Sequence, residues 1–268
     1  MTKIISIVNQ KGGVAKTTTT ANLGAALASQ GFQVLLLDLD SQCNLTQSLV
    51  GDLEPSQKCI ASAIQRETSL DNLILKTKTP GLFLVPAGEE MTGLDLELVG
   101  KTARERVLDR VLSRSKLGSF DFILIDTAPY ISLVTVNSLT ASDYYLVPTT
   151  AEYLPLRGIE RLTRSINEVR EILNSKLSLL GVLLTQYDTR KSITQQIETA
   201  LKEELGELLF QTRIRINTRF SSSPINQETI FQYEATKEGE AKGTDDYTSL
   251  GAEVLSRLGF TIKEAANG

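Results

Sequence analysis

The chain has 268 residues, of which 41% are hydrophobic and 22% charged, a globular composition that excludes a disordered or fibrous chain. Its formal net charge of -4 argues against a protein that coats nucleic acid with its whole surface. Because the sequence has no histidine and only two cysteines, Ser-His-Asp hydrolases, zinc hydrolases and disulfide-framework proteins are excluded as well.

Short runs of apolar, β-branched residues alternate with longer amphipathic segments along most of the chain. This alternation predicts a mostly parallel, twisted sheet with helices on both faces. The expected strands are Ile4–Val8, Val34–Asp38, Leu82–Pro86, Phe122–Asp126, Tyr145–Pro148, Leu179–Thr185 and Leu209–Arg213. The expected helices are Lys16–Gln30, Thr102–Arg114, Leu156–Leu173, Ile193–Leu205 and Tyr247–Leu258. We therefore predict one α/β domain over residues 1–268.

The segment from Ser221 to Asp246 departs from this alternation. It is polar, contains Pro224 and two glycines, and ends in charged residues. Proline and glycine interrupt regular structure, and connecting segments without an apolar period run over protein surfaces. We therefore interpret this segment as a long loop of the domain and not as a boundary between domains.

A glycine-rich segment, KGGVAKTTTT, lies between the first expected strand and the first expected helix. Glycines let successive backbone N–H groups converge on one anion, and the start of a helix adds its positive end. We expect Lys16 to neutralise β- and γ-phosphates and the Thr17 hydroxyl to ligate magnesium. The predicted phosphate site consists of Lys11, Gly12, Gly13, Val14, Ala15, Lys16, Thr17 and Thr18.

Carboxylates stand at the ends of two other expected strands. Asp38 and Asp40 follow the strand that begins at Val34, and Asp126 ends the strand Phe122–Asp126. In open α/β sheets, ligands bind at the carboxyl ends of the strands, so these acids are expected near the phosphate segment. An aspartate after four apolar strand residues is typical of the acid that holds magnesium through water in phosphoryl transfer.

These segments resemble the ParA/MinD family. KGGVAKTTTT is similar to the deviant Walker A box of that family, K-G-G-x-G-K-[ST], whose hallmark is the early lysine, here Lys11. The segment that begins at Asp38 resembles switch I, Asp126-Thr127-Ala128-Pro129 resembles switch II, and the likeness extends to about Leu258. The resemblance implies a single P-loop NTPase domain that binds ATP and Mg2+.

The resemblance also assigns roles to individual residues. Lys11 would reach across a homodimer that sandwiches ATP and contact the phosphates of the partner subunit. Asp40 would orient the attacking water, and Asp38 would stand behind the direct ligands of magnesium. The implied catalytic residues are thus Lys11, Lys16 and Asp40, the metal residues Thr17, Asp38 and Asp126, and a further nucleotide contact is Asn217, in a segment similar to N-x-R-x-S.

The chain departs from the family pattern at Ala15, where the family has glycine before the catalytic lysine. A Cβ atom at a point of close backbone approach to phosphate is costly in geometry. We therefore expect a weak intrinsic ATPase. A second departure is Arg215-Ile216, which replaces a Pro-Arg pair.

Two groups of arginines could form the electrostatic footprint for DNA. Arg213, Arg215 and Arg219 fall within seven residues that contain no acid, and Arg157, Arg161 and Arg164 share one helix face. The ParA branch binds DNA without sequence preference, and this resemblance assigns DNA binding to Arg213, Arg215 and Arg219. The alternative is that these are solvated faces, with the helix arginines paired to Glu160, Glu168 and Glu171.

The resemblance therefore implies an ATPase that dimerises on ATP, binds nucleoid DNA and positions a plasmid, a chromosome origin or a protein body such as a carboxysome. An adaptor protein on the cargo would stimulate hydrolysis. No apolar run is long enough for a signal peptide or a membrane span, so we expect a cytoplasmic, nucleoid-associated protein.

Three alternatives compete with this interpretation. A MinD-like membrane-cycling ATPase is disfavoured, because the tail Phe260–Gly268 lacks a broad apolar face flanked by cations. An iron–sulfur electron donor needs cysteines well beyond switch I, whereas the last cysteine is Cys59. An ATP-dependent ligase of the dethiobiotin or cobyrinic acid type fits Lys11 less well, and it stays open as the alternative.

Overall fold

The computed structural model describes residues 2–54, 57–151 and 155–260. An eight-stranded sheet has the order β3-β4-β2-β5-β1-β6-β7-β8, and only the pair β3–β4 is antiparallel. The strands are β1 (Lys3–Ile7), β2 (Val34–Leu39), β3 (Leu75–Lys76), β4 (Leu82–Val85), β5 (Phe122–Thr127), β6 (Tyr144–Thr150), β7 (Ser178–Tyr187) and β8 (Leu209–Arg215). All seven predicted strands are present, and the short edge strand β3 is the addition.

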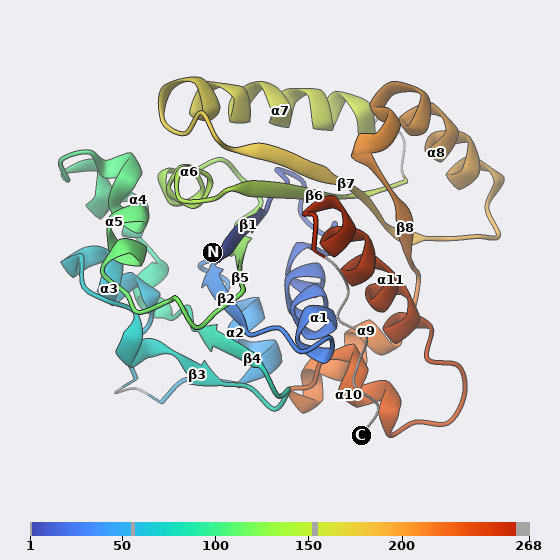
Figure 1. The fold of residues 1–268 in the computed structure, drawn as a ribbon, viewed down its shortest axis with the longest axis horizontal. Coiled ribbons are helices and arrows are strands. Elements are labelled where there is room, and N and C mark those ends of the chain that lie inside the picture. The colour runs from blue at the N-terminus through green and yellow to red at the C-terminus, as the bar shows by residue number, and fades with distance from the viewer. Residues whose placement is uncertain (1, 55–56, 152–154, 261–268) are drawn as a thin grey trace.

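Helices cover both faces of the sheet, with α1 and α11 on one side of the central strands and α3 to α6 on the other (Figure 1). Their bounds are α1 (Lys16–Ser29), α2 (Asn44–Leu49), α3 (Ile60–Arg66), α4 (Leu94–Val99), α5 (Val107–Ser113), α6 (Leu133–Thr140), α7 (Pro155–Ile172), α8 (Ser192–Leu205), α9 (Arg219–Ser222), α10 (Ile230–Ala235) and α11 (Lys242–Arg257). Short 3₁₀ turns lie at Asp71–Leu73, Glu89–Met91, Arg104–Arg106, Gly206–Leu208 and Ser223–Asn226. The predicted α/β fold class is confirmed.

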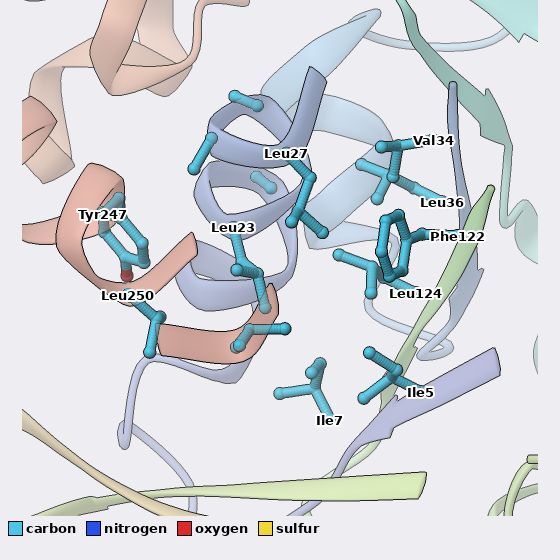
Figure 2. Close-up of a cluster of buried hydrophobic side chains, with 14 of the residues drawn as sticks. Ile5, Ile7, Leu23, Leu27, Val34, Leu36, Phe122, Leu124, Tyr247 and Leu250 are labelled. Atoms are coloured by element: carbon cyan, nitrogen blue, oxygen red, sulfur yellow. The ribbon is translucent and has the colours of Figure 1, made fainter. Parts of the chain in front are cut away.

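The central strands β2 and β5 each begin with four consecutive apolar residues, because both faces of these strands are buried, and their polar residues follow at the carboxyl ends. In β2, Val34 and Leu36 pack toward α1 and α11, whereas the alternating Leu35 and Leu37 pack toward α3 and α5. Figure 2 shows the first of these layers, in which side chains from the two helices face the inner strands. Burial of each such side chain contributes about 1.5–3 kcal/mol.

The register of the sheet brings the predicted site residues to one edge. β5 lies between β1 and β2, and Asp38 is the direct cross-strand neighbour of Asp126. Ile7 at the end of β1 is the neighbour of Asp126 on its other side, so the glycine-rich segment begins beside both acids. Parallel pairing thus assembles the phosphate segment and the carboxylates, as their positions at strand ends predict.

The prediction of one long loop over Ser221–Asp246 is wrong. The segment contains the end of α9, a 3₁₀ turn, α10 and the start of α11. A capping box of Thr229 and Gln232 starts α10, and the Ile230 side chain is buried against α1. The buried carboxylate of Glu234 accepts hydrogen bonds from the backbone N–H groups of Gly243 (3.3 Å) and Thr244 (2.8 Å), which joins α10 to the start of α11. Long-range contacts therefore order a segment whose local pattern is polar.

Besides α9 and α10, the helices that the apolar period did not reveal are α2, α3, α4 and α6, all of them short. They run from six residues in α2 and α4 to eight in α6, too few turns for a 3.6-residue period to emerge. Within the described ranges, no helix combines the length and apolarity that crossing a bilayer requires. The expectation about the C-terminal tail concerns residues 261–268, which lie outside the described residues.

Candidate active site

The glycine-rich segment wraps around the start of α1 in a conformation that depends on left-handed residues. Gly13 has φ 73° and Ala15, the residue before the helix, has φ 61°. α1 has no side-chain cap and no acidic residue in its first turn. The first N–H groups of a helix lack backbone partners and carry a partial positive charge. The segment therefore offers an uncapped helix start, which is suited to an anion.

Lys16 occupies the first position of that helix and is 7% exposed. Its ammonium group lies 3.4 Å from the carbonyl oxygen of Lys11. Burial lowers the pKa of Lys16, and the neighbouring Asp126 and Asp40 partly offset this shift. A bound phosphate would favour the charged form of Lys16 and so oppose this effect of burial.

Thr17 and Asp126 meet at the end of β5. The Thr17 hydroxyl donates a hydrogen bond of 2.7 Å to Oδ2 of Asp126, and the Thr20 hydroxyl lies 3.3 Å from Oδ1. Asp126 is fully buried, and this burial, together with the neighbouring Asp38, raises its pKa to about 8. Two buried carboxyl groups side by side are costly, and a divalent cation offsets that cost.

The protein donors fit magnesium only in combination with a ligand that brings oxygens of its own. Among the described residues, no three acidic or cysteine side chains gather as a metal site. Mg2+ takes one or two protein ligands and fills its octahedron with waters and substrate phosphates. The Thr17 hydroxyl and the Asp126 carboxylate would supply the one or two protein ligands, and a nucleotide bound at the phosphate loop would supply phosphate oxygens.

Asp38 lies beside Asp126, but its oxygens are taken up by protein groups. Its Oδ2 accepts hydrogen bonds from the backbone N–H (2.9 Å) and the hydroxyl (2.7 Å) of Thr46, and its Oδ1 accepts one from the N–H of Asp40 (3.2 Å). The Thr46 hydroxyl in turn accepts a bond from the N–H of Ala87. Burial raises the pKa of Asp38 to about 6. Asp38 therefore holds α2 against β2, and its part in the magnesium site stays a prediction.

Asp40 lines a pocket of about 630 Å³ beside the phosphate loop. The loop supplies Gly12, Gly13, Ala15, Lys16, Thr17 and Thr18 to this pocket. Asp40 is 6% exposed, and its Oδ1 accepts a 3.0 Å hydrogen bond from the N–H of Gln42. Another wall of the pocket comes from Phe220 to Thr229, most of which lies in the segment predicted to be a loop. Sequence reasoning missed this wall because only contacts distant in the chain bring it here.

Asn217 does not line this pocket. It lies in a neighbouring hollow of about 730 Å³ with Tyr187, Asp188 and Arg190. Its side-chain amide donates a 3.0 Å hydrogen bond to Glu234, and its Oδ1 accepts the N–H of Arg219. The assignment of Asn217 to the nucleotide therefore stays a prediction, and in this structure the residue braces the turn into α9.

The three arginines proposed for DNA have no acid nearby in the sequence, but they meet acids in space. Arg213 pairs with Glu198 and stacks over the Tyr187 ring at 5.2 Å. Arg215 forms a 2.7 Å ion pair with Asp246. The third is the least exposed: the Arg219 guanidinium approaches Glu234 at 3.5 Å and donates to the carbonyls of Glu238 and Glu240.

Two arginines of α7 show the opposite behaviour, whereas the side chain of Arg157, the third arginine of the predicted face, lies outside the described residues. Arg161 and Arg164 are exposed, and within the described ranges neither forms an ion pair. The alternative interpretation, pairing with Glu160, Glu168 and Glu171, is therefore not seen for these two arginines. Their positive charge remains available to solvent or to a partner.

Ala15 provides a first test of the loop. An alanine held at φ 61° is strained by about 1 kcal/mol, and glycine adopts this conformation freely. Even after the extra unfolded-state entropy of glycine, we expect Ala15→Gly to raise the free energy of unfolding by about 0.5 kcal/mol. We also expect tighter ADP binding and faster turnover, because the Cβ leaves the pocket. Urea unfolding and calorimetric titration measure the two effects.

Ala103→Gly is the matched control, because Ala103 is exposed, has φ 47° and does not line the pocket. It is expected to gain stability by a similar amount without a change in ADP affinity. Equal nucleotide affinity in Ala15→Gly and the unaltered protein would mean that the Cβ does not constrain the phosphate site.

Comparisons with known proteins agree with this geometry. The family model of the AAA domain matches residues 2–179. The chromosome partitioning protein ParA of Caulobacter vibrioides is 35% identical over 257 residues, which are 95% of this chain and 94% of that protein. The sporulation initiation inhibitor protein Soj of Bacillus subtilis is 36% identical over 256 residues, 96% of this chain and 99% of that one. Cobyrinic acid a,c-diamide synthase from Mycobacterium smegmatis, solved with ADP and magnesium, matches with a TM-score of 0.80 and 32% identity over 97% of this chain and 96% of that chain.

Proposed function

This chain belongs to the ParA/MinD family of partition ATPases, and from that premise we propose that it positions a cargo along the nucleoid. It is an ATPase whose cofactors are ATP and Mg2+. The observation that carries the proposal is one pocket in which the phosphate loop, Lys16 and Asp40 meet beside the buried Asp126. Phosphoryl transfer needs little else from a protein than positioning and charge neutralisation.

Each residue of this pocket has a physical task in hydrolysis. The uncapped start of α1 and the Lys16 ammonium bind the phosphates and stabilise the charge that develops on them. Thr17 and Asp126 would hold Mg2+, which when bound neutralises phosphate oxygens. Asp40 would orient the attacking water. The pocket wall from Phe220 to Thr229 excludes bulk water from one side.

Dimerisation, DNA binding and an adaptor complete the proposal. Lys11 lies on the exposed part of the loop, where a residue could reach a second subunit across bound ATP. Such a dimer would double the basic surface around Arg213 and make DNA binding depend on ATP. An adaptor on the cargo would then release the dimer by stimulating hydrolysis.

The test combines light scattering with salt-titrated binding of the Asp40→Ala protein to arbitrary duplex DNA, with and without Mg-ATP. An ATP-dependent dimer whose DNA affinity falls steeply with salt supports the proposal. A monomer indifferent to DNA would favour the second candidate, an ATP-dependent ligase, which the match to the Mycobacterium smegmatis synthase keeps in view. Such a ligase would hydrolyse ATP only in the presence of its acid substrate.

Arg213→Ala is expected to weaken DNA binding about threefold to tenfold and to lower the salt slope by about one, because one phosphate contact is lost. Arg213 is chosen because its side chain is the most exposed of the three, at 45%. Arg104→Ala is the matched control, since Arg104 is 44% exposed and also pairs with a glutamate, Glu105. Equal DNA affinity in both variants would remove Arg213 from the DNA surface.

A further inference from the structure

Gln186 near the end of β7 has an unusual backbone. Its φ is 50°, the left-handed region that a residue with a side chain adopts at a cost. The pairing between β7 and β8 shifts register between Leu184 and Tyr187, so an irregularity surrounds Gln186. Such irregularities redirect a side chain away from its regular position on a strand.

The redirected side chain reaches the phosphate loop. Its amide donates a hydrogen bond of 2.6 Å to the carbonyl oxygen of Gly13. The preceding residue acts on the next peptide of the loop, since the buried Thr185 hydroxyl lies 3.1 Å from the carbonyl oxygen of Val14. Thr185 also lies 3.1 Å from the carbonyl of Thr149 and shares its single proton between the two. Two successive loop carbonyls thus face β7.

Side-chain packing within the described ranges adds little support to Gly12 and Gly13. Gly12 and Gly13 are exposed, and a Cβ added to either would meet no atom within 4 Å, so side-chain packing does not fix their peptides. The Val14 side chain is buried, but a side chain does not set the orientation of the peptide that precedes it. Among the residues that the structure describes, the hydrogen bond from Gln186 is therefore the contact that orients the Gly13–Val14 peptide.

Peptide geometry gives this contact a consequence for binding. The C=O and N–H of one trans peptide point in opposite directions. A Gly13 carbonyl held toward Gln186 turns the Val14 N–H away from β7, and the Thr185 contact does the same for the N–H of Ala15. Within the described ranges neither N–H donates a hydrogen bond, and unpaired backbone donors require a partner.

We propose that Gln186 is a positioning residue of the phosphate loop, which holds the Val14 N–H toward the β-phosphate of a bound nucleoside di- or triphosphate. The inference rests on the proposed nucleotide binding and adds a residue outside the glycine-rich motif. AMP, which has no β-phosphate, does not use this donor. The side chain touches the loop and not the ligand, so its effect is on affinity and not on the chemical step.

Gln186→Met tests the proposal, because it keeps the length of the side chain and removes the donor. Calorimetric titration is expected to show ADP and Mg-ATP binding weakened about fivefold to tenfold, the loss of one oriented hydrogen bond, with AMP affinity unchanged. The KM for ATP rises by the same factor and kcat stays within about twofold. Gln196→Met, at an exposed glutamine of α8, is expected to change none of these values.

Gln186→Gly separates the side chain from its strained backbone, because glycine adopts φ 50° freely. We expect thermal unfolding to change little, because relief of the backbone strain and loss of the hydrogen bond offset each other, and ADP binding to be as weak as in Gln186→Met. Wild-type ADP affinity in either variant would overturn the inference. Failure of the unaltered protein to bind ADP or ATP would instead overturn the proposed function, so the two failures are distinguishable.

Discussion

Replacement of Lys16 by alanine is expected to weaken ATP binding by at least about 100-fold and to reduce hydrolysis to background. Hydrogen bonds to charged groups contribute about 1.5–3 kcal/mol each, and an ammonium that meets two phosphates makes more than one. Lys16 is 7% exposed at the start of α1, so no cation from the solvent replaces its charge there. Calorimetric titration with Mg-ATP and a phosphate-release assay measure the two losses.

The fold itself is expected to tolerate Lys16→Ala. Burial lowers the pKa of Lys16, which means that the folded apo protein disfavours its charged form. Thermal unfolding without nucleotide should therefore change little, whereas stabilisation by added ATP disappears. Lys101→Ala serves as the control, because Lys101 pairs with Glu67 at 3.5 Å and does not line the pocket. ATP affinity within a few-fold of wild type in Lys16→Ala would contradict the central role of this residue.

The features that could be predicted from the sequence are those marked by residues close together in the chain. Strands buried on both faces are continuous apolar runs, so β1, β2 and β5 are visible in the sequence, and the carboxyl-end rule then places Asp38 and Asp126 beside the phosphate segment. The glycines and lysines of that segment form a local motif, which can be identified without any tertiary contact.

The features that the sequence did not predict depend on contacts between residues far apart in the chain. Arg215 meets Asp246, 31 residues later, and the Gly13 carbonyl meets Gln186, 173 residues later. No local periodicity predicts such contacts, and each of them changes an interpretation. The first pairs Arg215, which has no acid nearby in the sequence, with an aspartate. The second supports the phosphate loop from a distant strand. The wall from Phe220 to Thr229 is hidden for the same reason, since Ile230 and Glu234 order it through α1 and α11.

Asp40→Ala is expected to retain ATP binding within about threefold and to lose hydrolysis by about 100-fold or more. A positioned acid or base contributes about 10²–10⁴ to rate, whereas a carboxylate contributes nothing favourable to the binding of an anion. Asp40 lines the pocket on the side of Lys16, whose pKa it influences, and its Oδ1 is held by the N–H of Gln42 at 3.0 Å. This hydrogen bond fixes the carboxylate in a position from which Oδ2 can accept a proton or orient water.

Asp40→Asn sharpens the test, because its carbonyl oxygen can still accept the Gln42 hydrogen bond while the charge is lost. Equal losses in the alanine and asparagine variants indicate that the carboxylate charge acts on the water, and a smaller loss in asparagine indicates orientation alone. Asp52→Ala, at an exposed aspartate outside the pocket, is expected to hydrolyse ATP normally. Hydrolysis at the wild-type rate in Asp40→Ala would assign the water to another group, and phosphate release under single-turnover conditions decides between these outcomes.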